Sequence, residues 1–239
     1  RPVPARVEII RSQKKFKKIN LFYLLANQWF SLKSFWQRRK EIDDYLSYNI
    51  FDLGVLLLAK LLGKKIIFLY IDDYAVLTSW PKLTPFFRLL VRGNFLMADL
   101  VVATARALFE EAKQGNKNVV YLPNAVSWQD VARGERPERP RVGVISNLGD
   151  WIDWQLIVGA AKKYPEIDFE ILGDGPVRQK ITEGKAGENL SNLRLLGHVK
   201  HEEIFHHSRN FDLAWIPFLR NKITDSVSPI KLFEYWLVQ

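Results

Sequence analysis

The chain has 239 residues, a formal net charge of +9 and no cysteine, and 48% of its residues are hydrophobic. This composition excludes a disordered chain, a disulfide-stabilised fold and a cysteine-ligated zinc site. No apolar run reaches the roughly 18–20 residues that a membrane-spanning helix needs. The lack of cysteine is compatible with a cytoplasmic enzyme, and we expect a cytoplasmic location.

The positive charge is concentrated in the first part of the chain. Residues 1–140 carry a net charge of +10, whereas residues 141–239 carry a net charge of −1. A basic half of this kind suggests an anionic partner such as an acidic membrane surface, although a solubilising basic surface is the alternative. No nucleic-acid-binding module accompanies the basic residues, so we predict no nucleic-acid partner.

The first half of the chain alternates between helical and strand-like patterns. A strand-like run at 6–10 and a basic cluster at 11–18 precede an aromatic-rich helical pattern over 20–40. This first helix fits either a core position or an interfacial membrane contact, because it combines two-sided apolarity with basic ends. The pattern then predicts helices at 53–62, 85–97 and 105–114 and strands at 65–70, 99–103 and 118–122.

The second half repeats this alternation after a charged segment, 127–140, whose two prolines and one glycine make it the best linker candidate. Apolar strands that alternate with helices indicate parallel sheets buried on both faces. We therefore predict an α/β chain with domains at 1–126 and 141–239. The expected strands of the second domain are 141–146, 168–172, 193–196 and 211–216, and its helices are 152–163, 176–182 and 200–208.

The motif that carries most chemistry is DSVSPIKLFE, residues 225–234. Ser228 and Pro229 are typical of an N-cap and a first helical residue. A cation in the first turn, Lys231, makes sense if an anion such as a phosphate binds there. Glu234 lies on the same helix face, where it can accept hydrogen bonds from sugar hydroxyls. The alternative is a capped helix whose Lys231 and Glu234 form a surface pair.

Two further groups of polar residues are candidates for chemistry. Asp72 and Asp73 follow the strand at 65–70, and we choose Asp73 as a general base for an acceptor hydroxyl. Capping of a turn is the alternative role for this carboxylate. Glu203 and His207 are one helical turn apart and could share a metal, but no HExxH pattern is present, so we predict no metal site.

The second half resembles the donor domain of GT-B-fold glycosyltransferases, in the group that includes family 4 and related polysaccharide enzymes. The matching pieces are VGVISNLGDWIDWQLI, FEILGDGP, NLRLLGHV, FDLAWIPF and DSVSPIKLFEY, in the family's order and spacing. In the first half, ADLVVATARALFEEAK and NVVYLPNAV resemble the end of the acceptor domain. The resemblance implies two Rossmann-like domains with parallel sheets, incomplete at the N- and C-termini.

The resemblance also implies which residues bind the donor. Lys231 would hold the donor diphosphate, and Glu234 the ribose or the sugar. The turns after the donor strands would line the nucleotide pocket, with the backbone at His198 and Val199 against the base. Where family 4 has a glutamate eight residues before Glu234, this chain has Ser226. The implied donor-binding residues are Asn147, Gly173, His198, Val199, Ser228, Lys231 and Glu234.

The activity that the resemblance implies is transfer of a sugar from a nucleoside-diphosphate sugar to a polysaccharide or lipid-linked acceptor, at the inner face of the cell membrane. No cofactor and no bound metal are expected, because a lysine and a helix N-terminus would stabilise the departing diphosphate. A nucleotide-sugar 2-epimerase on the same fold is one alternative. A truncated chain that binds nucleotide without catalysis is another.

Overall fold

The computed structural model describes residues 21–76, 81–126 and 138–237. The chain divides into two compact units, Arg1–Pro123 and Asn124–Gln239. Both are built from strands that alternate with helices. The strand-like run at 6–10, the basic cluster at 11–18 and most of the predicted linker lie outside the described residues.

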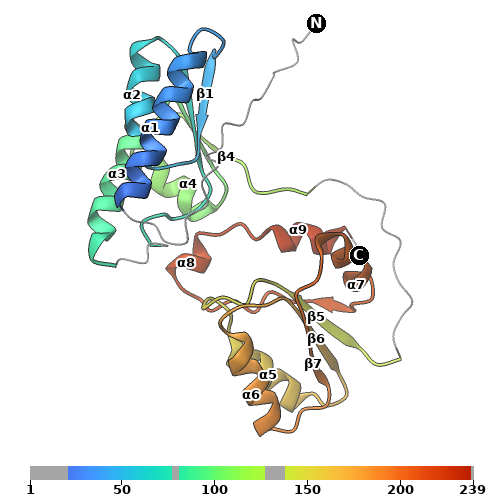
Figure 1. The fold of residues 1–239 in the computed structure, drawn as a ribbon. Coiled ribbons are helices and arrows are strands. Elements are labelled where there is room, and N and C mark those ends of the chain that lie inside the picture. Colours follow the sequence, from blue (N-terminus) through green and yellow to red (C-terminus); the bar gives the residue numbers. More distant parts are fainter. Residues whose placement is uncertain (1–20, 77–80, 127–137, 238–239) are drawn as a thin grey trace, which may run out of the picture. The chain divides into compact units, whose positions relative to one another are not determined.

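The first unit is a four-stranded parallel sheet with its strands in sequence order. Each connecting helix leads to the next strand in the same direction, so right-handed crossovers place these helices on one face. The first helix, α1 (Leu21–Arg38), packs beside α2 (Figure 1). The strands are β1 (Asp44–Ser47), β2 (Lys65–Tyr70), β3 (Leu100–Ala103) and β4 (Val119–Tyr121), and the connecting helices are α2 (Leu53–Leu61), α3 (Thr84–Met97, after the 3₁₀ turn Pro81–Leu83) and α4 (Arg106–Lys113).

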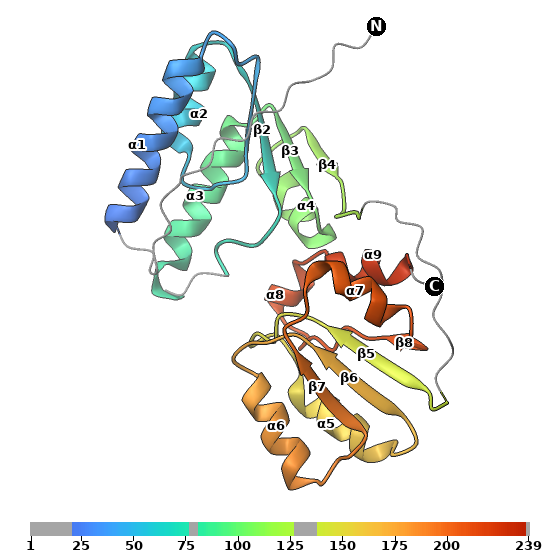
Figure 2. The ribbon, with the colours of Figure 1, turned by 45° about the vertical axis from the view of Figure 1, so that its right-hand side comes forward.

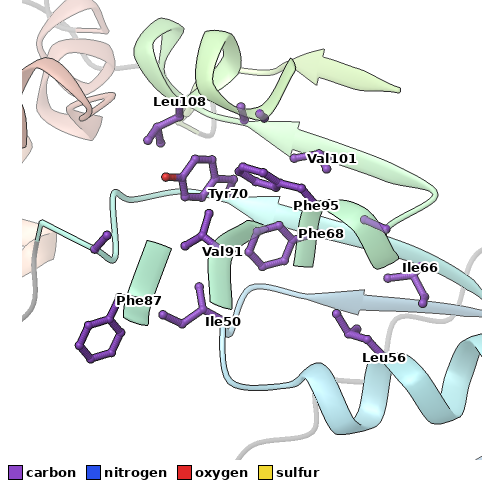
Figure 3. Packing of buried hydrophobic residues seen from close by; sticks show 14 of the residues in the cluster. Ile50, Leu56, Ile66, Phe68, Tyr70, Phe87, Val91, Phe95, Val101 and Leu108 are labelled. Atoms are coloured by element: carbon purple, nitrogen blue, oxygen red, sulfur yellow. The ribbon is translucent and has the colours of Figure 1, made fainter. Parts of the chain in front are cut away.

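The core of the first unit lies between the sheet and this helix layer. Alternate residues of β2 point the same way, and Phe68 and Tyr70 meet the ring of Phe95 on α3, with centroids 6.1 and 5.1 Å apart (Figure 3). On the other face, Leu46 and Val120 of the edge strands are exposed. The prediction of burial on both faces is therefore wrong for these two strands.

The second unit is a parallel sheet in the order β7-β6-β5-β8. The first two crossovers run in one direction, and the third returns past β5 to β8. Figure 2 shows α5 and α6 on one face of the sheet and α7 on the other, as right-handed crossovers require. The strands are β5 (Arg141–Ile145), β6 (Asp168–Leu172), β7 (Leu193–Gly197) and β8 (Leu213–Ala214), and the helices are α5 (Trp154–Lys163), α6 (Arg178–Gly187) and α7 (His201–Ser208).

Several element boundaries differ from the prediction. The expected helix at 176–182 starts later and runs further, as α6, and the expected strand at 211–216 pairs over only two residues, as β8. The last helix, α9 (Ile230–Trp236), has Pro229 at its N-cap position, so the prediction of Ser228 as the N-cap is wrong. Ser228 precedes a proline, which favours extended backbone, and its hydroxyl accepts a hydrogen bond from the backbone N–H of Asn124 instead.

Candidate functional site

The strand order of the second unit reverses direction at β5, between β6 on one side and β8 on the other. In open parallel sheets, ligands bind outside the carboxyl ends of the strands at such a reversal. A pocket of about 190 Å³, including space open to solvent, lies at this point. Its lining is mainly apolar, and Lys231 brings a positive charge to it. The lining residues are Val144, Ile145, Ser146, Trp215, Ile216, Pro217, Phe218 and Lys231.

Lys231 pairs with Glu234 in the ligand-free chain. Its Nζ donates to Glu234 Oε2 over 2.6 Å, and the two side chains are 28% and 4% exposed. A buried carboxylate is costly without a counter-charge, so the ammonium stabilises Glu234 in place. The lysine–glutamate pair of the alternative interpretation is thus present, but Glu234 is buried and the pair is not a surface pair.

Tyr235 fixes α9 against the sheet. Its hydroxyl accepts a hydrogen bond from the backbone N–H of Ile145 over 2.8 Å, at the end of β5. Burial, with a smaller contribution from the nearby Glu234 charge, raises the pKa of Tyr235 above the ordinary tyrosine value, so its hydroxyl stays protonated. Because Ile145 also lines the pocket, this contact sets the position of α9 relative to it. Sequence reasoning missed this role of Tyr235.

The chain before α9 is held by a contact between residues far apart in the sequence. Asn124 donates from its backbone N–H to Ser228 Oγ over 3.2 Å and from its side-chain Nδ2 to the Ser228 carbonyl over 2.7 Å. The hydroxyl of the buried Ser226 donates to the Lys222 carbonyl over 2.9 Å, at the end of the short helix α8 (Lys222–Asp225). An uncharged, hydrogen-bonded side chain therefore occupies the position of the family-4 glutamate.

The turns after β5, β6 and β7 are tied to one another. Gly173 has a φ of +140°, and a Cβ there would collide with the carbonyl oxygen of Ser146, so only glycine fits. The Gly173 N–H donates to the Gly197 carbonyl over 2.7 Å. Asn147 and His198 are exposed in these turns. The predicted residues Asn147, Gly173, His198 and Val199 thus lie at the carboxyl end of one sheet, and their donor contacts remain predictions.

Comparisons with solved structures identify the architecture. Similar structures are a UDP-forming α,α-trehalose-phosphate synthase from Burkholderia vietnamiensis (TM-score 0.68, 12% identity, covering 93% of this chain and 63% of that one) and Anabaena HepE in complex with UDP (0.66, 15%, 87% and 61%). TarM from S. aureus is a third (0.61, 16%, 79% and 39%). The chain has a GT-B glycosyltransferase fold. No family model matches the sequence, and no curated protein does.

The predicted GT-B architecture is therefore confirmed. The chain spans about two fifths to three fifths of the length of these similar structures, from 39% to 63%. In GT-B terms, the pocket with Lys231 lies in the unit whose sequence resembles the donor domain.

Asp73 lies in the first GT-B unit, just after β2. Its Oδ1 accepts from the backbone N–H groups of Ala75 and Val76 over 3.1 and 3.3 Å, and its Oδ2 accepts from Arg88 Nη2 over 2.8 Å. Arg88 also donates to Glu111, which accepts from the Tyr70 hydroxyl over 2.8 Å. These contacts are those of the capping alternative, and the role of Asp73 as a general base remains a prediction.

Within the described ranges, no three or more histidine, aspartate or glutamate side chains are grouped so that they could hold a metal ion. Glu203 and His207 are both on α7. Nor does any described helix have the length and hydropathy to span a bilayer.

Proposed function

We propose that this chain is part of a glycosyltransferase and that its second unit binds the donor, a nucleoside-diphosphate sugar. The observation that carries the proposal is Lys231 in the pocket at the strand reversal. An ammonium group among apolar side chains attracts an anion more strongly than it does in water. A departing diphosphate develops negative charge, and a preorganised cation stabilises it.

The pair of Lys231 and Glu234 gives the site a means of exchanging partners. A diphosphate that draws the ammonium away leaves the buried Glu234 carboxylate in need of other donors. Hydroxyls of a ribose or a sugar are such donors, and they arrive with the same ligand. The proposal therefore assigns the diphosphate to Lys231 and a hydroxyl-bearing ring to Glu234.

The size of the pocket limits what it holds. At about 190 Å³ it is smaller than the roughly 300–1,000 Å³ usual for a whole small-molecule ligand. We assign the diphosphate to it and the nucleoside to the turns that carry Asn147, Gly173, His198 and Val199. HepE is in complex with UDP, and the trehalose-phosphate synthase is UDP-forming, which makes UDP the first base to test.

The acceptor in this proposal is a polysaccharide or a lipid-linked glycan, and the place is the cytoplasmic face of the membrane. The TarM structure contains fondaparinux and α-GlcNAc-glycerol, which supports a glycan acceptor. Asp73 would act as the general base once Arg88 releases it. Transfer would need no cofactor and no metal, because Lys231 supplies the positive charge.

The decisive test measures ligand-induced thermal shifts with UDP, GDP, ADP and their sugar conjugates. At about a hundred times its dissociation constant, a ligand adds roughly 2.7 kcal/mol of stability. We expect one nucleotide to produce this shift in the wild type and Lys231→Ala to abolish it. Lys180→Ala, at an exposed lysine of α6, should leave it unchanged, and so should a chelator.

Lys231→Ala also removes the counter-charge of Glu234, so this variant is expected to melt earlier without ligand. The ligand-induced shift, rather than the melting temperature, is therefore the readout, and Lys231→Ala with Glu234→Gln serves as the charge-balanced control. An undiminished shift in both variants would refute the role of Lys231. A cooperative melt with no shift for any nucleotide would refute the donor site. Conversion of a nucleotide sugar without acceptor would favour the epimerase.

A further inference from the structure

The helix α1 is attached to the first unit by one side only. Phe35 is fully buried and meets Tyr45 of β1 edge-to-face, with centroids 5.3 Å apart. Gly54 of α2 lies against the side chains of Gln28 and Leu32. These contacts bind α1 to its own unit, and they leave its opposite side outside the core.

The opposite side of α1 carries two exposed tryptophans and a lysine. Trp29 is 66% exposed and Trp36 is 50% exposed, and Lys33 between them is exposed. Positions i, i+4 and i+7 share one face of a helix. We call this face, Trp29, Lys33 and Trp36, the α1 stripe. No ion pair joins Lys33 to another described residue.

The charge around the α1 stripe has one sign. Residues 28–40 contain four basic residues and no acidic one, and the first acid, Glu41, follows the end of the helix. The guanidinium of Arg39 lies 4.1 Å from the centroid of the Trp36 ring and donates to the Trp36 carbonyl over 2.6 Å. The aromatic surface is therefore bordered by cations.

Scattered exposed apolar side chains are ordinary on protein surfaces, but paired tryptophans bordered only by cations fit one kind of partner well. Indole rings favour the headgroup level of a bilayer, where their apolar and polar parts are both accommodated. Lysine and arginine beside them are attracted to acidic headgroups. A protein surface that matched this stripe would have to be acidic throughout.

We propose that the α1 stripe docks the chain on an anionic lipid bilayer, with the two indole rings at headgroup level. This is a surface contact. The inference names the membrane partner of the proposed glycosyltransferase and would bring it to a lipid-linked acceptor. It requires neither donor binding nor transfer, so a failure here leaves the proposed donor site untouched.

The test is co-sedimentation of the full chain with vesicles of phosphatidylcholine, alone or with about one third phosphatidylglycerol. The variants are Trp29→Ala with Trp36→Ala, and Lys33→Glu. Their matched controls are Trp236→Ala, a tryptophan that is 65% exposed on α9, and Lys180→Glu on α6. Melting curves of each variant verify that it is folded.

We expect binding to the anionic vesicles that weakens as salt is raised from about 0.1 M to about 0.5 M. The tryptophan pair should lower the partition coefficient roughly tenfold and Lys33→Glu at least about fivefold, with both controls near wild type. Equal binding to neutral vesicles, or wild-type binding by the folded stripe variants, would overturn the proposal. So would a dimer that forms in solution and is lost with the tryptophan pair.

Discussion

Asp72 and Asp73 are adjacent in sequence, yet they have different environments. Asp73 is buried and receives two backbone N–H groups and the Arg88 guanidinium. The carboxylate of Asp72 is half-buried and makes no hydrogen bond to another described side chain. Burial raises the pKa of Asp72 above the ordinary aspartate value. Of the two residues, Asp72 is therefore the one whose charge is poorly compensated.

Asp72→Asn should change how stability depends on pH. Since the pKa of Asp72 is raised on folding, the folded state binds more protons, and its stability falls as pH rises from about 3.9, the unfolded value, through the raised pKa. The asparagine variant lacks this loss. The free energy of unfolding of the variant, minus that of the wild type, should thus increase with pH across this window and then level off.

Urea unfolding at a series of pH values measures this difference. Asp225→Asn, at an exposed aspartate of α8, is the matched control and should give a flat difference. A difference for Asp72→Asn that stayed flat, or decreased with pH, would contradict the assignment of a raised pKa.

At the scale of single residues, local chemistry was predictable and long-range contacts were not. A lysine in the first turn of the last helix and a glutamate three residues later are visible in the sequence, and the structure brings them together in one pair. The partner of Ser228 is Asn124, 104 positions away. A cap is the common use of a serine before a helix, and no local pattern indicates that a distant asparagine occupies its hydroxyl.

At the scale of elements, the position of Lys231 depends on how α9 packs against β5. The helix has seven residues and no side-chain cap, so its own hydrogen bonds hold it weakly. The contact from the Ile145 N–H to the Tyr235 hydroxyl crosses from the sheet to the helix inside the core. We therefore regard Tyr235 as a positioning residue for the donor site.

Tyr235→Phe should lower both stability and nucleotide affinity. The Ile145 N–H loses its acceptor inside the core, which costs about 1–3 kcal/mol. If Tyr235 acts through Lys231, the affinity losses of Tyr235→Phe and Lys231→Ala will not add in the double variant. Calorimetric titration with UDP, together with urea unfolding, measures both quantities.

Tyr164→Phe is the matched control, because Tyr164 is an exposed tyrosine after α5. Independent, additive losses of affinity would assign Tyr235 a purely structural role. Unchanged stability would contradict the importance of its hydrogen bond.

The predicted elements succeed where apolar periodicity and punctuation agree. The run KIIFLY became β2, and Gly63 ends α2 with a φ of +69°, as the C-cap signal indicated. The short β1 has the sequence DYLS, too short and polar for a strand signal. β8 is short because only Leu213 and Ala214 pair with β5, after which the chain turns along the pocket. Pairing of this kind depends on the neighbouring strand and cannot be read locally.

At the scale of the whole molecule, the order of motifs predicted the GT-B fold although identity to the similar structures is only 12–16%. Alternation of strands and helices specifies parallel sheets, and one long return crossover determines where the strand order reverses. The pocket follows from that topology. The pairing of Tyr235 with β5 does not, because it depends on packing.

Because the two units are separate compact bodies, we expect a nucleotide to protect them unequally. Hydrogen exchange with saturating UDP should slow the backbone amides at 144–148, 215–218 and 228–236. Amides of β1–β4 should exchange as they do without ligand. The Lys231→Ala chain is the control and should show no change in either unit. Protection confined to β1–β4 would place the nucleotide site in the wrong unit.

The contact of Asn124 with Ser228 also has a mechanical consequence. Its two hydrogen bonds fasten the chain at residue 124 to the residue just before Pro229. A pull on the backbone at Asn124 is therefore transmitted directly to the start of the helix that carries Lys231. It need not first travel along the intervening 104 positions. The clasp gives the chain a short load path from its connecting segment to its cationic pocket.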